Sequence, residues 1–174
     1  MANILTVFFS LILSFSNPSK EDLKVNQEKN VTTYYLIRHA EKDRSNSGNR
    51  NPDLTDKGMA RAENWAKVLK DVEFDAVYST DYNRTIQTAT PLAKQNQLEI
   101  LKYDPTNLWS EDFQKDTKGK TVMVVGHSNT TPQFANAILG QKQYDDIDDS
   151  ENGALFIIQV QENGSTTSKV LYIN

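Results

Sequence analysis

Two histidines stand at positions where the chain could do chemistry. His39 and His127 are the 2 histidines of the sequence, and each follows an apolar run almost at once. A neutral imidazole is a good nucleophile toward phosphorus, and it needs no deprotonation near neutral pH. Arg38 precedes His39, and Arg84 follows another apolar run. Because two guanidiniums offer forks of donors that fit a tetrahedral oxyanion, these residues predict phosphoryl chemistry at one pocket.

Strands alternating with helices must position these residues. Short β-favouring runs alternate with helical patterns from Thr33 onward, which is typical of βαβ units and a largely parallel sheet. Ligands of such sheets bind outside the carboxyl ends of the strands, where both histidines fall. The predicted strands are 33–37, 76–78, 98–101 and 121–125, and the predicted helices follow Thr55, begin at Asn83 or Thr85, and cover 105–115 and 130–139.

The end of the chain predicts an antiparallel addition to this sheet. Ala154–Val160 and Ser168–Tyr172 are β-favouring runs on either side of Asn163-Gly164, a hairpin turn signal. Earlier in the chain, Pro91 predicts a bend or a first turn in the helix that begins at Asn83 or Thr85.

The composition excludes several kinds of site and partner. The 174 residues are 37% hydrophobic and 24% charged, which is typical of one globular domain. Cysteine is absent, which excludes disulfides, thiolate zinc sites and thiol nucleophiles. Two histidines are too few for a three-histidine metal site, so no metal or other cofactor is expected. A net charge of -4 supplies no broad basic face, so nucleic acid is not an expected partner.

The amino-terminal segment predicts a secretory signal. Ile4–Phe15 carries no charged side chain and is shorter than the roughly 20 apolar residues of a membrane-spanning helix. Ser14 and Ser16 have the size and spacing that signal peptidase needs, although no Lys or Arg precedes the run. The alternative is a buried first strand or helix, which would leave the protein in the cytoplasm. The predicted organisation is a signal over 1–16, a polar tether over 17–31 and one domain over 32–174, exported to the periplasm or outside the cell without a membrane span.

Four motifs in order resemble the histidine phosphatase superfamily, also called phosphoglycerate-mutase-like, and in particular its small phosphohistidine-phosphatase-like branch. The motifs are Leu36-Ile37-Arg38-His39-Ala40-Glu41, Asn51-Pro52-Asp53-Leu54-Thr55 with Gly58, Tyr78-Ser79-Thr80 with Arg84-Thr85-Ile86-Gln87-Thr88-Ala89, and Val124-Val125-Gly126-His127-Ser128-Asn129. They lie between about Thr33 and Gly140. The resemblance implies a three-layer α/β/α fold and a phosphohistidine intermediate on His39, with Arg38, Arg84 and His127 completing the phosphate pocket.

The proton donor to the leaving group stays open between two carboxylic acids. Asp104 follows the third predicted strand and is a possible general acid, as in many relatives, although a turn or helix cap before Pro105 explains it equally well. Glu41, two residues past His39, is the second candidate. Thr55 could donate to the phosphate, but a helix cap accounts for it.

Several charged loop residues have simpler interpretations. Lys42, Arg44 and Arg50 could contact an anionic substrate, and solvation of a loop is the plainer reason for them. The acidic cluster of Asp145, Asp146, Asp148 and Asp149 lacks the spacing of an EF-hand and is interpreted as a solvated loop.

The function predicted from these observations is metal-independent hydrolysis of a small phosphomonoester or of phosphohistidine. One alternative is a catalytically silent module of the same fold that binds phosphorylated ligands or a protein. Another is a phosphomutase, which the short chain disfavours. Neither the substrate nor the oligomeric state follows from the sequence.

Overall fold

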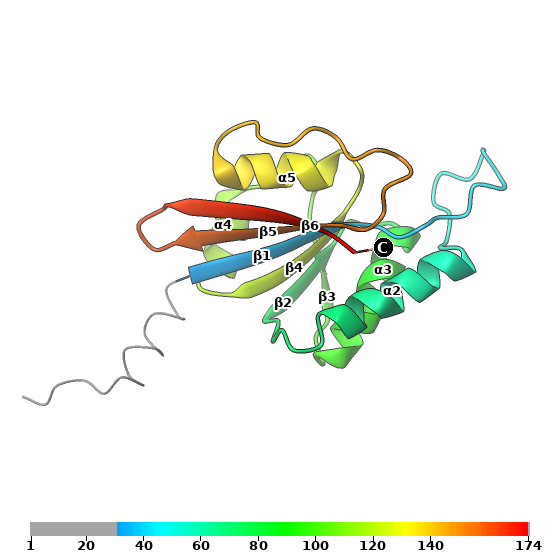
Figure 1. Cartoon of the computed structure of the whole chain (residues 1–174), viewed down its shortest axis with the longest axis horizontal. Coiled ribbons are helices and arrows are strands. Elements are labelled where there is room, and N and C mark those ends of the chain that lie inside the picture. The colour runs from blue at the N-terminus through cyan, green and yellow to red at the C-terminus, as the bar shows by residue number, and fades with distance from the viewer. Residues whose placement is uncertain (1–30, 174) are drawn as a thin grey trace, which may run out of the picture.

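A six-stranded sheet runs through the centre of the computed structural model, which describes residues 31–173 (Figure 1). In chain order the strands are β1 (Val31–Arg38), β2 (Ala76–Ser79), β3 (Ile100–Lys102), β4 (Thr121–Gly126), β5 (Ala154–Gln161) and β6 (Thr166–Tyr172). Their order in the sheet is β3-β2-β4-β1-β5-β6. The first four are parallel where they pair, and β5 is antiparallel to both β1 and β6. The predicted parallel sheet with an antiparallel edge hairpin is confirmed.

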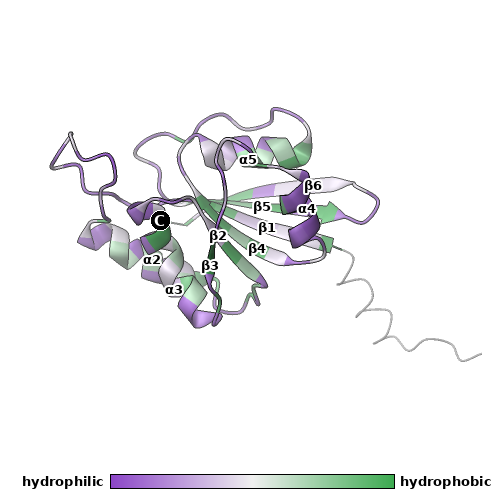
Figure 2. Ribbon diagram, turned by 180° about the vertical axis from the view of Figure 1, so that it is seen from behind, coloured by the Kyte–Doolittle hydropathy of each residue, from purple (hydrophilic) through white to green (hydrophobic). Residues whose placement is uncertain are grey.

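Helices cover both faces of this sheet. They are α2 (Asp56–Val68), α3 (Asn83–Gln95), α4 (Glu111–Thr117) and α5 (Thr130–Leu139). α2 and α3 lie on one face, and α4 and α5 lie on the other (Figures 1 and 2). The fold is therefore the expected three-layer α/β/α arrangement.

Alternation along the central strands divides the core into two halves. On β4, Val122 and Val124 pack with the α4 and α5 side, whereas Met123 and Val125 pack with the α2 and α3 side. A strand buried on both faces must be apolar throughout, which explains the continuous run at 121–125. Figure 2 shows the contrast between the hydrophobic interior strands and the hydrophilic loop after β1.

Some predicted boundaries were wrong. The helix expected over 105–115 is α4, which begins only at Glu111 because the Ser110 hydroxyl caps it by accepting from the Phe113 amide. β3 starts two residues later than predicted, at Ile100. Pro91 lies inside α3, near its carboxyl end, and not in its first turn. β1 begins at Val31, one residue inside the predicted tether.

The predicted signal over 1–16 and residues 17–30 of the tether lie outside the described residues. Within residues 31–173, no helix has both the length and the apolar character needed to cross a membrane.

Candidate active site

The pairing of β1 with β4 brings the two histidines together. Arg38, the last residue of β1, lies opposite Gly126, the last residue of β4. His39 directly follows the first strand, and His127 directly follows the second. The His39 amide also donates to the Gly126 carbonyl at 2.9 Å. The centroids of the two imidazole rings lie 5.5 Å apart. The two histidines were expected at the same edge of the sheet, and the structure places their rings next to each other there.

Gly126 makes this close arrangement possible. A Cβ at this position would lie 2.9 Å from each of three side-chain oxygens, those of Thr130, Thr131 and Tyr103. Real side chains almost never approach so closely. The glycine before His127 is therefore needed to pack β4 under the start of α5 and the end of β3.

Backbone contacts fix the ring of His39. Its Nδ1 lies 2.7 Å from the carbonyl oxygen of Ala40. Because a carbonyl oxygen only accepts, Nδ1 carries the proton, and in the neutral ring Nε2 holds the free electron pair. The Ala40 amide donates to the Thr88 hydroxyl on α3, and the Asn152 side-chain amide donates to the His39 carbonyl. The residue is 4% exposed, so its Nε2 is presented from a rigid, buried position.

His127 contacts two polar groups supplied by the segment after β2. Its Nε2 lies 3.0 Å from the Thr80 hydroxyl, and its Nδ1 lies 3.4 Å from Nη2 of Arg84. The Tyr82 ring stands edge-on to the imidazole, with centroids 5.2 Å apart. The β2–α3 connection thus orients both nitrogens of His127.

Arg84 points buried donors at this site. It lies in the first turn of α3, and its guanidinium sits 4.3 Å from the centre of the Tyr82 ring. Its Nε and Nη1 are buried and have no hydrogen-bond acceptor among the described residues. Buried donors without a partner are costly, so they mark a place where an acceptor binds. A phosphoryl group has the oxygens and the charge that these donors need.

Arg38 is held by the loop between α5 and β5. Its Nη1 donates to the carbonyls of Asp148, Asp149 and Glu151, and its Nη2 donates to the Asp149 carboxylate at 2.6 Å. Its Nε is buried and has no acceptor among the described residues. The side chain is 2% exposed, so this network fixes one orientation of the guanidinium beside His39.

Both imidazoles are held neutral. Burial lowers the pKa of His39 to about 3, and the charges of Arg38 and Arg84 act in the same direction. Burial likewise lowers the pKa of His127 to about 4, helped by Arg84, Lys42 and Arg38. Burial and the neighbouring arginines also lower the pKa of Lys42. The site is therefore a pair of neutral rings in a field of positive charge, which suits an anionic ligand.

Glu41 is engaged in ion pairs. Both of its carboxylate oxygens accept from Nε of Arg61 at 3.0 Å, and Lys57 lies 3.2 Å away. Burial raises the pKa of Glu41, but the hydrogen bonds from Arg61, a backbone hydrogen bond, the charge of Arg61 and the contact with Lys57 together outweigh it, so the net effect lowers the pKa. This second acid candidate lines the cavity beside His39 but holds its proton weakly.

Asp104 and Thr55 make local contacts. One oxygen of the Asp104 carboxylate accepts from the amide and the hydroxyl of Thr106, and the residue lines a different cavity from that of His39. Hydrogen bonds from Thr106 lower the pKa of Asp104. These contacts are those of the turn cap that the sequence allowed as the alternative. Thr55 caps α2 by accepting from the Gly58 amide, and it donates to the Glu41 carbonyl.

A cavity of about 210 Å³ opens beside His39. Lys42, Arg44 and Lys57 line it together with Arg38 and Asp149. Arg50 is not among its lining residues. Asp149 was interpreted as part of a solvated loop, yet its carboxylate bridges Arg38 and Arg44, with the Arg44 contact at 2.7 Å.

Sequence reasoning missed several residues that support the site. Thr80, Thr88, Asn152 and Asp149 all contact a histidine or an arginine of the site or its backbone. For Thr80 and Thr88, the available signal was their place in the motif around Arg84, which assigned them no role. For Asn152 and Asp149 the sequence carries no local signal, because their partners are more than one hundred residues away.

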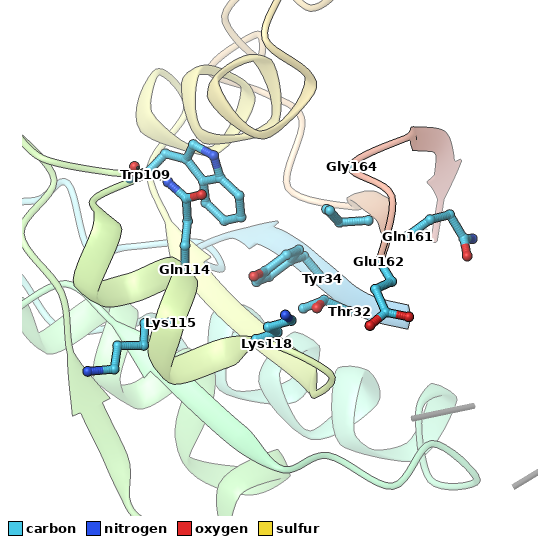
Figure 3. Close-up of a pocket in the computed structure, with 10 residues that line it drawn as sticks. Thr32, Tyr34, Trp109, Gln114, Lys115, Lys118, Gln161, Glu162 and Gly164 are labelled. Atoms are coloured by element: carbon cyan, nitrogen blue, oxygen red, sulfur yellow. Dashed lines mark hydrogen bonds between the residues drawn. The ribbon is translucent and has the colours of Figure 1, made fainter. Parts of the chain in front are cut away.

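A larger cavity of about 390 Å³ lies elsewhere, between α4 and the β5–β6 turn (Figure 3). Tyr34 and Trp109 form its aromatic wall, and Lys118 and Glu162 stand at its rim. Its lining contains no histidine and no arginine. The smaller cavity is lined by Arg38 and His39, whereas His127 and Arg84 lie next to His39 but are not among the residues that line it.

The comparisons with known proteins agree with this location. Residues 34–106, which include Arg38, His39 and Arg84, match the family model of the histidine phosphatase superfamily, branch 1. Over this range the chain resembles the histidine phosphatase superfamily. Phosphoserine phosphatase 1 of Hydrogenobacter thermophilus is 34% identical over 73 residues, which span 40% of this chain and 35% of that protein. The match thus covers about a third of the relative's length.

Solved structures of two phosphatases share the fold. The α-ribazole phosphatase from Shigella flexneri is 19% identical, with a TM-score of 0.65 over 81% of this chain and 96% of that one. The protein histidine phosphatase SixA, solved with tungstate, is 17% identical, with a TM-score of 0.65 over 80% of this chain and 96% of that one. Identities this low show a common fold and leave the substrate open.

Proposed function

We propose that this protein is a phosphatase that transfers a phosphoryl group from a small phosphorylated compound to His39 and then to water. The observation that carries the proposal is the set of buried donors on Arg84 and Arg38 that have no acceptor within residues 31–173, next to two neutral imidazoles. A module that only stabilised its own fold would gain nothing from such donors, because each is costly to bury unpaired.

In the first step Nε2 of His39 attacks phosphorus. The N–P bond forms, the bond from phosphorus to the leaving oxygen or nitrogen breaks, and the leaving atom takes up a proton from solvent water. In the second step a water oxygen attacks phosphorus, the N–P bond breaks and inorganic phosphate leaves. Arg38 and Arg84 would stabilise the negative charge on the equatorial oxygens, and His127 would donate to one of them. The positive charge comes from side chains, so the proposed reaction needs no metal ion.

The leaving group determines which substrates suit the site. Glu41 is held by Arg61 and Lys57, and Asp104 caps a turn, so neither is placed as an available acid. A poor leaving group such as an alkoxide needs a proton from the protein, whereas an imidazole or a phenol needs much less help. The proposal therefore favours phosphohistidine and aryl phosphates over alkyl phosphates.

The test is a phosphatase assay with a panel of phosphorylated compounds in the presence of a metal chelator. We expect release of phosphate by the full chain, and its loss in His39→Ala. Thr90→Val is the matched control, because Thr90 lies on α3 and, in the part of the chain that the structure describes, its hydroxyl bonds only the Ile86 carbonyl. Turnover by His39→Ala at the rate of the unmodified protein would exclude His39 as the nucleophile.

Trapping the intermediate gives a second test. A phosphoenzyme on histidine is a phosphoramidate, so its label should be lost in acid and kept in base. An acid-stable label would contradict the proposal. If the protein binds inorganic phosphate but turns over no member of the panel, the silent binding module is the better description.

Export through residues 1–16 stays a prediction, and we propose it together with the phosphatase function. Cell fractionation followed by a blot for the protein tests it, with a variant lacking those residues as the control.

A further inference from the structure

A chain of threonine hydroxyls determines which nitrogen of His127 carries its proton. Thr85 donates its hydroxyl proton to the carbonyls of Thr80 and Tyr82, both at 2.9 Å. Its oxygen is therefore the acceptor for the Thr80 hydroxyl at 3.0 Å. Each hydroxyl has only one proton to give. Thr80 has already given its proton to Thr85, so toward His127 it can only accept.

The direction of this chain fixes the tautomer of His127. The Thr80 oxygen lies 3.0 Å from Nε2 of His127, so Nε2 must carry the hydrogen and donate it. In a neutral ring Nδ1 then holds the free electron pair. Nδ1 faces Nη2 of Arg84 at 3.4 Å, and a guanidinium nitrogen can only donate. Both contacts of the ring therefore agree on the same tautomer.

Burial makes this assignment strict. Thr80 and Thr85 are both 0% exposed, so water cannot replace a missing partner at either hydroxyl. If the Thr80 hydroxyl instead donated to His127, the buried oxygen of Thr85 would lose the hydrogen bond that it accepts from Thr80, and the loss of a buried hydrogen bond is costly. The segment between β2 and α3 thus determines the tautomer of His127, which directly follows β4.

We propose that Thr80 is a positioning residue that holds His127 as the Nε2–H tautomer and so keeps Nδ1 as the ring nitrogen that serves the phosphoryl group. The role in turnover rests on the proposed function, whereas the tautomer itself does not. A bound phosphoryl oxygen accepts the Arg84 donor, and its negative charge favours a proton on Nδ1, which is taken from solvent or from the phosphate monoanion. Nδ1–H then donates to a phosphoryl oxygen. In the reverse tautomer, Nδ1–H would face the Arg84 donor and Nε2 would have no proton to give to the Thr80 oxygen, so the ring would lose its hydrogen bonds to both residues.

The direct test is nitrogen NMR of the full chain labelled at its histidines, at pH 7 and without added phosphate. Only 2 histidines give signals, and His39→Asn assigns them. Nitrogen chemical shifts separate protonated from unprotonated ring nitrogens. We expect His127 to be protonated at Nε2 and His39 at Nδ1. A wild-type spectrum with His127 protonated at Nδ1 would overturn the proposal without any variant.

Three substitutions extend the test. Thr80→Val keeps the shape but removes the hydroxyl, so we expect mixed tautomers at His127 and no change at His39. Thr80→Ser should restore the wild-type pattern, and Thr90→Val should leave it unchanged. For phosphate release we expect a fall in kcat of about tenfold in Thr80→Val, most of it recovered in Thr80→Ser. An unchanged His127 pattern in folded Thr80→Val would overturn the proposal whatever the activity.

The two proposals fail in different ways. If the wild-type protein has the expected tautomers but releases no phosphate from any compound, the proposed function fails and the tautomer assignment stands. If phosphate is released and Thr80→Val changes the tautomer but not kcat, the role of Thr80 in turnover is excluded while the phosphatase function stands.

Discussion

The Asp149 carboxylate binds the same guanidinium that the site needs for an anion. Its Oδ1 lies 2.6 Å from Nη2 of Arg38, and its other oxygen contacts Arg44. Hydrogen bonds from Arg44 and Arg38 lower the pKa of Asp149, so it is ionised at neutral pH. Yet three backbone carbonyls also hold Arg38, so its position does not depend on this carboxylate alone.

We therefore expect Asp149→Asn to bind phosphate more tightly than the wild-type protein. The substitution removes a negative charge that repels the ligand and engages Arg38. Because the Asp149 side chain is 67% exposed, the effect should stay near 1 kcal/mol, which is about a fivefold gain in affinity. Titration calorimetry with inorganic phosphate at fixed ionic strength measures it. Asp148→Asn is the control, since the Asp148 carboxylate bonds Ser150 and no arginine. A weaker affinity in Asp149→Asn would instead show that the carboxylate is needed to hold the site together.

The pKa values of the two histidines predict an unusual pH dependence of stability. Burial, and then neighbouring positive charge, lowers the pKa of His39 to about 3 and that of His127 to about 4. In the unfolded chain both titrate near 6.5. Between these values the unfolded state binds protons that the folded state does not, so stability decreases as pH falls below about 6.5.

Chemical denaturation at pH 7 and at pH 5 tests this dependence. We expect a loss of up to about 1.4 kcal/mol per pH unit for each histidine once the pH is below 6.5. His39→Asn should show a smaller loss over the same range, because one of the two groups is gone. An equal loss in that variant, or imidazole signals that titrate near pH 6.5 in the folded protein, would contradict the lowered pKa values.

The fold and the centre of the site follow from the sequence because they depend on short-range patterns. The run at 33–37 favours a strand, and the run at 121–125 is apolar enough to identify a strand buried on both faces. The parallel topology then places the histidine that follows each strand at the same edge of the sheet. Arg84 was predictable for the same reason, since it opens the helix after β2.

Other contacts could not be predicted because they depend on which segments meet in space. Arg38 and Asp149 are 111 residues apart, and a cluster of acidic residues in a loop does not reveal which one reaches an arginine. Asp104 illustrates a different difficulty. Its position after a strand suits both an acid and a turn cap, and only the contact with Thr106 distinguishes them. The direction of the Thr80 hydroxyl likewise depends on Thr85 and on the carbonyls around it.

Glu41 should prove to be a structural residue. Arg61 donates to its carboxylate through Nε and Nη2 and also donates to the Ile173 carbonyl, so it ties the segment after His39 to α2 and to the end of the chain. The Glu41 side chain is 18% exposed and the Arg61 side chain is 15% exposed. Arg61→Gln leaves a partly buried carboxylate poorly paired, and we expect the free energy of unfolding to fall by about 2 kcal/mol. Urea denaturation measures it, and Lys57→Gln is the control, because the 76% exposed Lys57 should cost under about 1 kcal/mol.

The same assignment makes a kinetic prediction for Glu41 itself. An acid that protonates the leaving group affects alkyl phosphates most, since their leaving group is the poorest, and it sets one limb of the pH–rate profile. Glu41→Gln keeps a polar group beside Arg61 but has no proton to give. We expect its kcat to stay within about threefold of wild type, with the same ratio between aryl and alkyl phosphates and an unshifted profile. A loss of about 100-fold confined to alkyl phosphates would instead identify Glu41 as the proton donor, because general acid catalysis contributes at least that much.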